Sequence, residues 1–141
     1  NKIMVEEINF PLDTSCNSKI GMTLGGHETS CLASRYALAA RKQEKFWGVA
    51  NVLFDKHPRT EEEMIEFIKE AHLGLDMDKL LQDANSPEVM IELQQDINKA
   101  SELHINGTPA IIINDVFYMG GMPYDELVEK IDTAAKRAEN N

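Results

Sequence analysis

The sequence predicts an α/β domain, because short apolar runs near its two ends flank a long stretch with helical periodicity. Residues 3–10 are mostly apolar and β-leaning and stop at Pro11, which predicts a strand. Near the other end, Ala110–Ile113 and Val116–Met119 are two more apolar runs, separated by Asn114 and Asp115. Two such runs joined by two turn-prone residues predict a hairpin of the type I′ kind.

Composition limits the function classes open to this chain. Its 141 residues, 43% of them hydrophobic, fit one compact domain over residues 1–141. The formal net charge of −10 weighs against nucleic acid or an anionic membrane as the primary partner, because phosphate contacts need clustered Lys and Arg. The apolar runs fall well short of the ~18–20 residues that span a bilayer, so we expect no membrane span. No signal peptide is recognisable, so we expect any export signal outside this chain.

Helical periodicity runs from about residue 28 to residue 103. It predicts helices over about 28–42, 44–56, 60–71 and 75–82, and a long one from Ser86 to about 103. Thr60 with Glu63 is typical of a capping box, and Ser86 followed by Pro87 of an N-cap and first helical position. Inward-facing side chains are expected to include Phe46, Trp47, Ala50, Leu53, Phe54 and Met90.

A last helix is expected from Pro123. Its buried stripe is predicted to consist of Leu127, Val128, Ile131, Ala134 and Ala135, and the charged tail over residues 136–141 is expected to fray. The histidines His57, His72 and His104 stand where helices or turns end, so we expect structural roles for them. The seven methionines fall mostly in apolar stripes, where core packing is the default.

The two cysteines, Cys16 and Cys31, allow three interpretations. They can form a structural disulfide that pins the loop over residues 13–26 to the helix that follows it. They can be inert thiols in a reducing cytosol. They can also join His27 in a metal site, although three ligands without a fourth make that a weak signal, and we expect no metal. We expect no dissociable cofactor.

The residues around Thr108 and Pro109 resemble a known family. The stretch over residues 100–115, continuing to Gly120, Gly121, Tyr124 and Leu127, resembles the C-terminal half of DsbA-type thiol-disulfide oxidoreductases. The N-terminal part carries Phe10-Pro-Leu-Asp, Cys16-Asn17, His27, Cys31-Leu-Ala-Ser-Arg-Tyr-Ala, Gln43-Glu-Lys-Phe-Trp47 and Leu53-Phe54. It is similar to DsbA-like domains that stand alone or are fused to vitamin K epoxide reductase homologues. Together the matches run from about residue 8 to residue 131.

The resemblance implies an α/β, thioredoxin-like fold with a helical insertion over about residues 28–103. It implies that Thr108 and Pro109, with Gly107 before them, form a cis-proline loop that binds substrate, and that Cys16 and Cys31 pair as a structural disulfide. Candidate substrate contacts are Met119, Met122 and Tyr124, at the end of the predicted hairpin and just after it. The implied substrates are exported proteins or peptides, and the implied redox partner is a membrane quinone-linked or vitamin K epoxide reductase-like protein. The implied location is extracytoplasmic, in the periplasm or cell envelope.

One departure from the family is informative. Its members carry Cys-x-x-Cys at the start of their first helix, after a first strand, and this chain has only two cysteines, 15 residues apart. The chemistry of such enzymes requires a thiolate whose pKa is lowered by a helix N-terminus and a partner cysteine two residues on that resolves the mixed disulfide. We therefore expect the chain to lack the first strand and the active-site helix, and to be inactive alone. Either a longer protein or a partner chain, as in a strand-swapped oligomer, would supply the strand. The alternative is a non-catalytic module that binds peptides or a partner.

Overall fold

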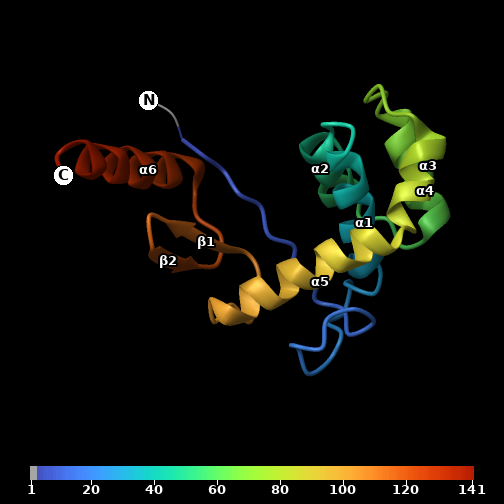
Figure 1. Ribbon diagram of the computed structural model, residues 1–141, viewed down its shortest axis with the longest axis horizontal. Coiled ribbons are helices and arrows are strands. Elements are labelled where there is room, and N and C mark those ends of the chain that lie inside the picture. The colour runs from blue at the N-terminus through green and yellow to red at the C-terminus, as the bar shows by residue number, and fades with distance from the viewer. Residues whose placement is uncertain (1–2) are drawn as a thin grey trace. The chain divides into compact units, whose positions relative to one another are not determined.

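A computed structural model describes residues 3–141 (Figure 1). It contains six helices and two strands in the order α1 to α5, β1, β2, α6. Their bounds are Ser30–Arg41, Phe46–Lys56, Glu61–Glu70, Met77–Ala84 and Pro87–Glu102 for α1 to α5, Ala110–Ile113 and Val116–Met119 for β1 and β2, and Tyr124–Glu139 for α6. The chain divides into two compact units, a helical unit (Ile8–His104) and a hairpin unit (Ile105–Asn141 with the segment before Ile8).

Helix α1 is the centre of the helical unit. It packs against α2, α4 and α5, while α2 also packs against α3 and α4 against α5. The fully buried side chains come from every one of these helices and include Tyr36, Leu38, Val49, Met64, Ile68, Leu80, Leu93 and Ile97. The helical periodicity of residues 28–103 therefore reflects a real core, which lies between the helices of this unit.

The ends of these helices follow the signals in the sequence. Thr60 caps α3 by accepting from the N–H of Glu63 at 3.1 Å, and Ser86 caps α5 by accepting from the N–H of Val89 at 3.3 Å. His57, His72 and His104 each adopt a positive φ just beyond a helix, as residues that terminate a helix often do. The prediction that these histidines stand at helix ends is confirmed.

Three side chains expected in the core lie at the surface instead. Trp47 is 55% exposed, Phe54 78% and Met90 44%. Helix α2 buries Val49, Ala50 and Leu53 on the side that faces its neighbours, and Trp47 and Phe54 lie outside that side. The prediction was wrong because apolar residues occur on more of the circumference of α2 than its neighbouring helices cover.

The hairpin unit contains the only sheet among residues 3–141. Strands β1 and β2 pair antiparallel, with Ala110 opposite Met119 and Ile113 opposite Val116. Asn114 and Asp115 both have positive φ, of 44° and 69°, which confirms the predicted type I′ turn. Helix α6 packs on β1.

Two predictions for α6 were wrong. The helix continues to Glu139, so residues 136–139 are helical and not frayed. None of its residues is fully buried, and Val128 of the predicted stripe is 38% exposed. A two-stranded sheet offers too little surface to cover the apolar side of a helix of 16 residues.

The strand predicted over residues 3–10 is absent from the structure. This segment is extended without strand pairing, and Ile3, Met4 and Val5 are 61%, 97% and 63% exposed. A strand exists only where a neighbouring strand pairs with its backbone, and among the described residues no strand pairs with this segment. The end of the segment is fixed differently, since the backbone N–H and the side-chain Nδ2 of Asn9 both donate to Asp96 Oδ2.

No helix in the part of the chain that the structure describes is long and apolar enough to cross a membrane.

Candidate functional site

The loop of Gly107, Thr108 and Pro109 leads directly into β1. The Thr108–Pro109 peptide bond is cis, and the carbonyl oxygen of Pro109 accepts a hydrogen bond from the N–H of Gly120 at 2.9 Å. This bond extends the β1–β2 ladder by one step and fixes Pro109 beside the end of the hairpin. Thr108 and Pro109 are both exposed. Within residues 3–141, the backbone N–H and C=O of Thr108 have no hydrogen-bond partner, so both can bind another chain.

Close packing fixes this loop against the strand beside it. A Cβ atom on Gly107 would lie 3.1 Å from Cε of Met119, and one on Gly121 would lie 3.8 Å from Cγ of Pro109. The glycine before Thr108 therefore lets the methionine side chain approach the loop. Met119 itself remains 54% exposed, so the loop and this thioether form one partly apolar surface.

Met122 and Tyr124, the other predicted substrate contacts, follow β2 in the sequence. Met122 is half-buried, while Tyr124, the first residue of α6, is 77% exposed. The ammonium group of Lys130, on α6, lies over the ring of Tyr118, on β2, at 4.8 Å from the ring centre. Of these candidate contacts, Met119 is placed against the loop by its approach to Gly107, and a flexible thioether there suits an extended peptide of varied sequence.

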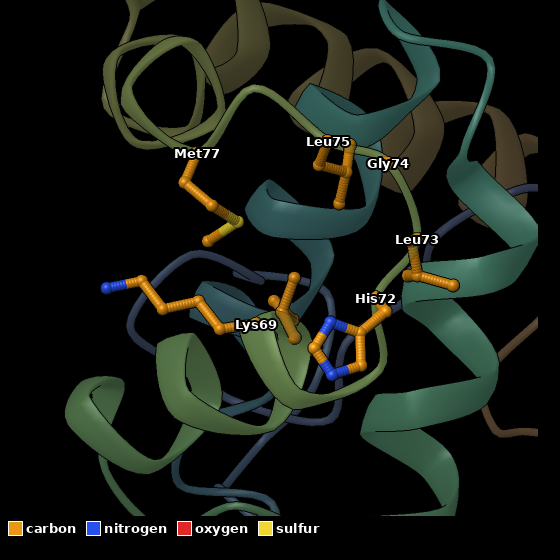
Figure 2. A pocket seen from close by; sticks show the side chains of 7 residues that line it. Lys69, His72, Leu73, Gly74, Leu75 and Met77 are labelled. Atoms are coloured by element: carbon orange, nitrogen blue, oxygen red, sulfur yellow. The ribbon is translucent and has the colours of Figure 1, made fainter.

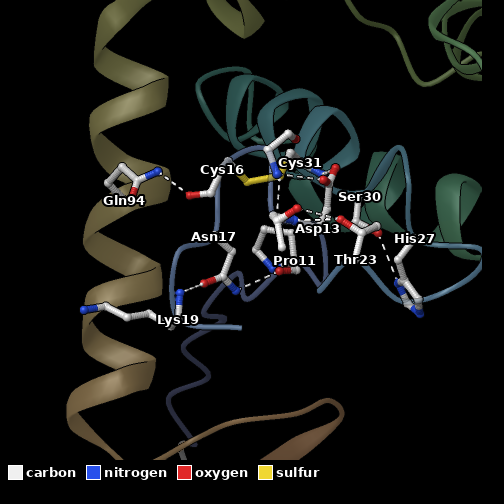
Figure 3. The surroundings of a disulfide bond; sticks show 12 residues. Pro11, Asp13, Cys16, Asn17, Lys19, Thr23, His27, Ser30, Cys31 and Gln94 are labelled. Carbon is white, nitrogen blue, oxygen red and sulfur yellow. Dashed lines mark hydrogen bonds between the residues drawn. A yellow bond between two sulfur atoms is a disulfide. The ribbon is translucent and has the colours of Figure 1, made fainter. Parts of the chain in front are cut away.

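Cys16 and Cys31 form a disulfide in the helical unit, with their Cα atoms 5.9 Å apart (Figure 3). Cys31 is the second residue of α1 and is buried, whereas Cys16 is half-buried in the loop that precedes the helix. The side-chain amide of Gln94, on α5, donates to the carbonyl of Cys16 at 2.7 Å. The bridge therefore joins the loop to α1, and the glutamine joins the same loop to α5.

Buried polar side chains hold the rest of this loop in place. Asp13 is 5% exposed, and its carboxylate accepts from the N–H of Ser15 at 2.9 Å and from the N–H of Cys31 at 3.4 Å. Asn17 is fully buried, donates to the carbonyl of Pro11 at 2.8 Å and accepts from the N–H of Lys19 at 2.9 Å. These bonds satisfy polar groups that would otherwise be costly to bury, so the loop is a fixed part of the fold.

The two cysteines considered for a metal site with His27 are bonded to each other instead. The bridge occupies both sulfur atoms, which removes them as thiolate ligands, and His27 Nδ1 lies 3.1 Å from the hydroxyl of Ser30. Among residues 3–141 no cluster of His, Cys, Asp and Glu is arranged to hold a metal ion. The disulfide cross-links two positions 15 residues apart in the sequence.

Sequence reasoning missed the polar residues that support this loop. Asp13 and Asn17 lie in blocks that carry the family resemblance, but no role was predicted for them, and Gln94 lies in no such block. All three act through partners that folding brings close. Helix α1 has a similar case, since the hydroxyl of the fully buried Tyr36 donates to Glu61 Oε1 on α3 at 2.8 Å. Burial and this hydrogen bond raise the pKa of Tyr36 above its ordinary value. Tyr36 and Glu61 are 25 residues apart, so the sequence alone gave no indication that they would be hydrogen-bonded.

A Thr-Pro loop that opens a hairpin, a closing helix after the hairpin and a helical unit inserted before it together define a class of protein. This is the thioredoxin-like fold in the form that carries a helical insertion.

Comparisons with known proteins place the chain within this class. The family model of the DSBA-like thioredoxin domain matches residues 6–132, so the chain belongs to that family. It is similar to a probable disulfide bond formation protein D of Bacillus anthracis, with 22% identity over 142 residues that cover 96% of this chain. It is also similar to the crystal structure of a thioredoxin-like oxidoreductase from Silicibacter pomeroyi, with a TM-score of 0.62 and 28% identity over 87% of this chain.

The chain spans 59% of the Bacillus protein and 66% of the Silicibacter chain. It is a DSBA-like thioredoxin domain that corresponds to less than two thirds of the length of each relative.

Proposed function

We propose that this chain is the substrate-binding part of a thiol-disulfide oxidoreductase that forms, reduces or isomerises disulfides in exported proteins. The redox Cys-x-x-Cys of that enzyme would lie outside these 141 residues. The observation that carries the proposal is the family match over residues 6–132, combined with the engagement of both cysteines in one disulfide. The relatives named above are described as a disulfide bond formation protein and an oxidoreductase, which supports the same reaction class.

The contribution of this chain would be to bind and orient the substrate. In the reaction, a thiolate attacks one sulfur of a disulfide, a mixed disulfide forms, the other sulfur leaves as a thiolate, and a second thiol resolves the product. Gly107, Thr108 and Pro109 would hold the polypeptide that carries the reacting sulfur. The exposed backbone of Thr108 would pair with the substrate backbone as in β-augmentation, and Met119 would contact a neighbouring side chain.

A substitution at Thr108 tests this binding role. The probe is the reduced and alkylated B chain of insulin, which is extended and carries no reactive thiol. Thr108→Pro removes the N–H donor and should abolish binding of this peptide, measured by calorimetry, whereas Thr108→Val keeps the donor and should bind as the parent chain does. Equal affinity of both variants would refute backbone pairing at this loop.

A non-catalytic binding module is the second candidate, because the same loop could bind a peptide without any redox step. The isolated chain cannot by itself catalyse exchange in either case, so its insulin reductase activity should be negligible. Appreciable activity would show that Cys16 and Cys31 are a redox pair and would overturn their structural assignment.

An extracytoplasmic location is part of the proposal. Disulfides persist in oxidising compartments such as the bacterial periplasm. Both cysteines of this chain are joined in one disulfide. The redox partner would be a membrane quinone-linked or vitamin K epoxide reductase-like protein. Thiol titration of the denatured, unreduced chain purified from the cell envelope should give no free thiol, and two free thiols would contradict the location.

A further inference from the structure

The proposed function makes no use of two features of the chain. One is a hollow of about 360 Å³ beside the end of α3, where Lys69 and His72 meet apolar side chains (Figure 2). Both of these residues are exposed, so solvent satisfies their polar groups and the hollow requires no ligand. The other feature is the pair Asn106-Gly107, which directly precedes Thr108 and carries chemistry of its own.

Asn106-Gly107 is the only asparagine-glycine pair in the sequence. Asparagine loses its side-chain amide without an enzyme when the backbone nitrogen of the next residue attacks its side-chain carbonyl carbon, which makes it a thermolabile residue. A glycine in the next position favours this attack, because glycine has no Cβ to hinder ring closure. The sequence therefore combines the residue that reacts with the neighbour that hinders it least.

The structure leaves both reacting groups free. Asn106 is exposed and lies outside helix and strand. Among residues 3–141, neither the side-chain amide of Asn106 nor the backbone N–H of Gly107 has a hydrogen-bond partner. No backbone hydrogen bond holds residues 105–108 in that part of the chain either. The amide can therefore turn toward the nitrogen of Gly107 without breaking an interaction of the fold.

Two other asparagines lack this combination. Asn17 is fully buried, and its amide donates to the carbonyl of Pro11 and accepts from the N–H of Lys19. Asn114 is exposed like Asn106, but it lies in the hairpin turn with a positive φ and is followed by Asp115, whose Cβ hinders the attack. These two residues are internal controls for burial and for the identity of the next residue.

We propose that Asn106 is a deamidation site that gives the loop of Gly107, Thr108 and Pro109 a negative charge. The nitrogen of Gly107 bonds to Cγ of Asn106, the Cγ–Nδ2 bond breaks, and ammonia leaves with the proton of the Gly107 N–H. Water then opens the succinimide. Attack at Cγ gives an aspartate at position 106, and attack at the main-chain carbonyl carbon gives an isoaspartate. Either product has an ionised carboxylate at neutral pH.

The consequence for substrates rests on the proposed function of the loop. The new carboxylate would be two residues before Thr108, whose free backbone would pair with the substrate. A peptide with an anionic group beside its reacting sulfur would be repelled, because two like charges about 4 Å apart in water weaken binding about fivefold. A neutral peptide would bind as before, so the modification would narrow the range of substrates.

Peptide mapping by mass spectrometry tests the site. The folded chain and a synthetic peptide of residues 103–109 are incubated together in mildly alkaline buffer. We expect Asn106 to convert in the chain at a rate similar to that in the peptide, Asn114 to convert much more slowly, and Asn17 to stay intact. An intact Asn106 beside a converted peptide, or equal conversion of Asn114, would overturn the proposal.

Binding of two insulin B chains tests the consequence. One is alkylated with iodoacetate and is anionic at its cysteines, and the other is alkylated with iodoacetamide and is neutral there. Incubated chain and fresh Asn106→Asp should both bind the anionic probe about fivefold more weakly than fresh chain does, and the neutral probe equally well. Incubated Asn106→Gln, which cannot close the same ring, should keep its affinity for both probes.

Two results would overturn this consequence. They are an equal loss for the two probes, and the same loss in incubated Asn106→Gln. Failure of the fresh chain to bind either probe would overturn the proposed function together with the consequence drawn from it. Failure of Asn106 to convert would overturn the modification site alone, because binding by the fresh chain does not depend on it.

Discussion

Removal of the Cys16–Cys31 disulfide should change the free energy of unfolding by an amount that follows from the position of the bridge in the sequence. The bridge spans a sequence separation of 15 residues, and closing a loop of that length in the unfolded chain is worth about 3 kcal/mol in the chain-entropy model. In the double variant Cys16→Ala, Cys31→Ala the native loop keeps its other bonds, such as those of Asn17 to Pro11 and Gln94 to Cys16, which involve backbone carbonyls. The loss should therefore come mainly from the unfolded state.

Urea denaturation followed by circular dichroism measures this loss. We expect the free energy of unfolding to fall by about 3 kcal/mol in the double variant, and the dependence on urea to become steeper, since the uncrosslinked unfolded chain exposes more surface. Reductant should destabilise the parent chain by a similar amount and leave the variant unchanged. A loss below about 1 kcal/mol, or an equal response of the variant to reductant, would refute a cross-link that stabilises the fold.

Further predictions concern single side chains. Tyr36→Phe should lower the free energy of unfolding by about 1 kcal/mol at neutral pH, because it removes the hydrogen bond to Glu61 Oε1. The raised pKa of Tyr36 implies that its stabilisation is complete below about pH 10 and is lost as pH rises further, by up to about 1.4 kcal/mol per pH unit relative to Tyr36→Phe. An identical alkaline decline in both proteins would contradict this. Ser86→Ala should cost about 1 kcal/mol by removing the cap of α5, whereas Ser101→Ala, near the end of α5, should cost less. Equal losses would argue against the cap.

The sequence predicted well those features that depend on neighbouring residues. The caps at Thr60 and Ser86 and the turn at Asn114 and Asp115 are encoded within four residues each, and the structure has all of them. Helical periodicity located the five helices of residues 28–103 because each buries one side against α1 or its neighbours. The family resemblance predicted the fold for the same reason, since it rests on blocks of adjacent residues in the right order.

The features that depend on distant partners were not predictable in the same way. The apolar run over residues 3–10 has the composition of a strand, but no strand among the described residues pairs with it. Trp47 and Phe54 have the spacing of core residues, but α1 and α3 cover only the other side of α2. The role of Asp13 was not predicted either, because it requires the N–H of Cys31, 18 residues away. Periodicity shows which side chains are apolar, and only the fold shows what covers them.

The most direct test of the proposed function is the coding sequence upstream of Asn1. The account predicts an open reading frame that continues upstream and encodes a β-leaning run followed by Cys-x-x-Cys within about 40 residues, the length of a strand, a turn and a helix. Such a motif would provide the thiolate and the resolving cysteine that residues 1–141 do not contain. A frame that continues upstream without a Cys-x-x-Cys, or that begins at the described chain, would contradict the oxidoreductase and favour the non-catalytic binding module.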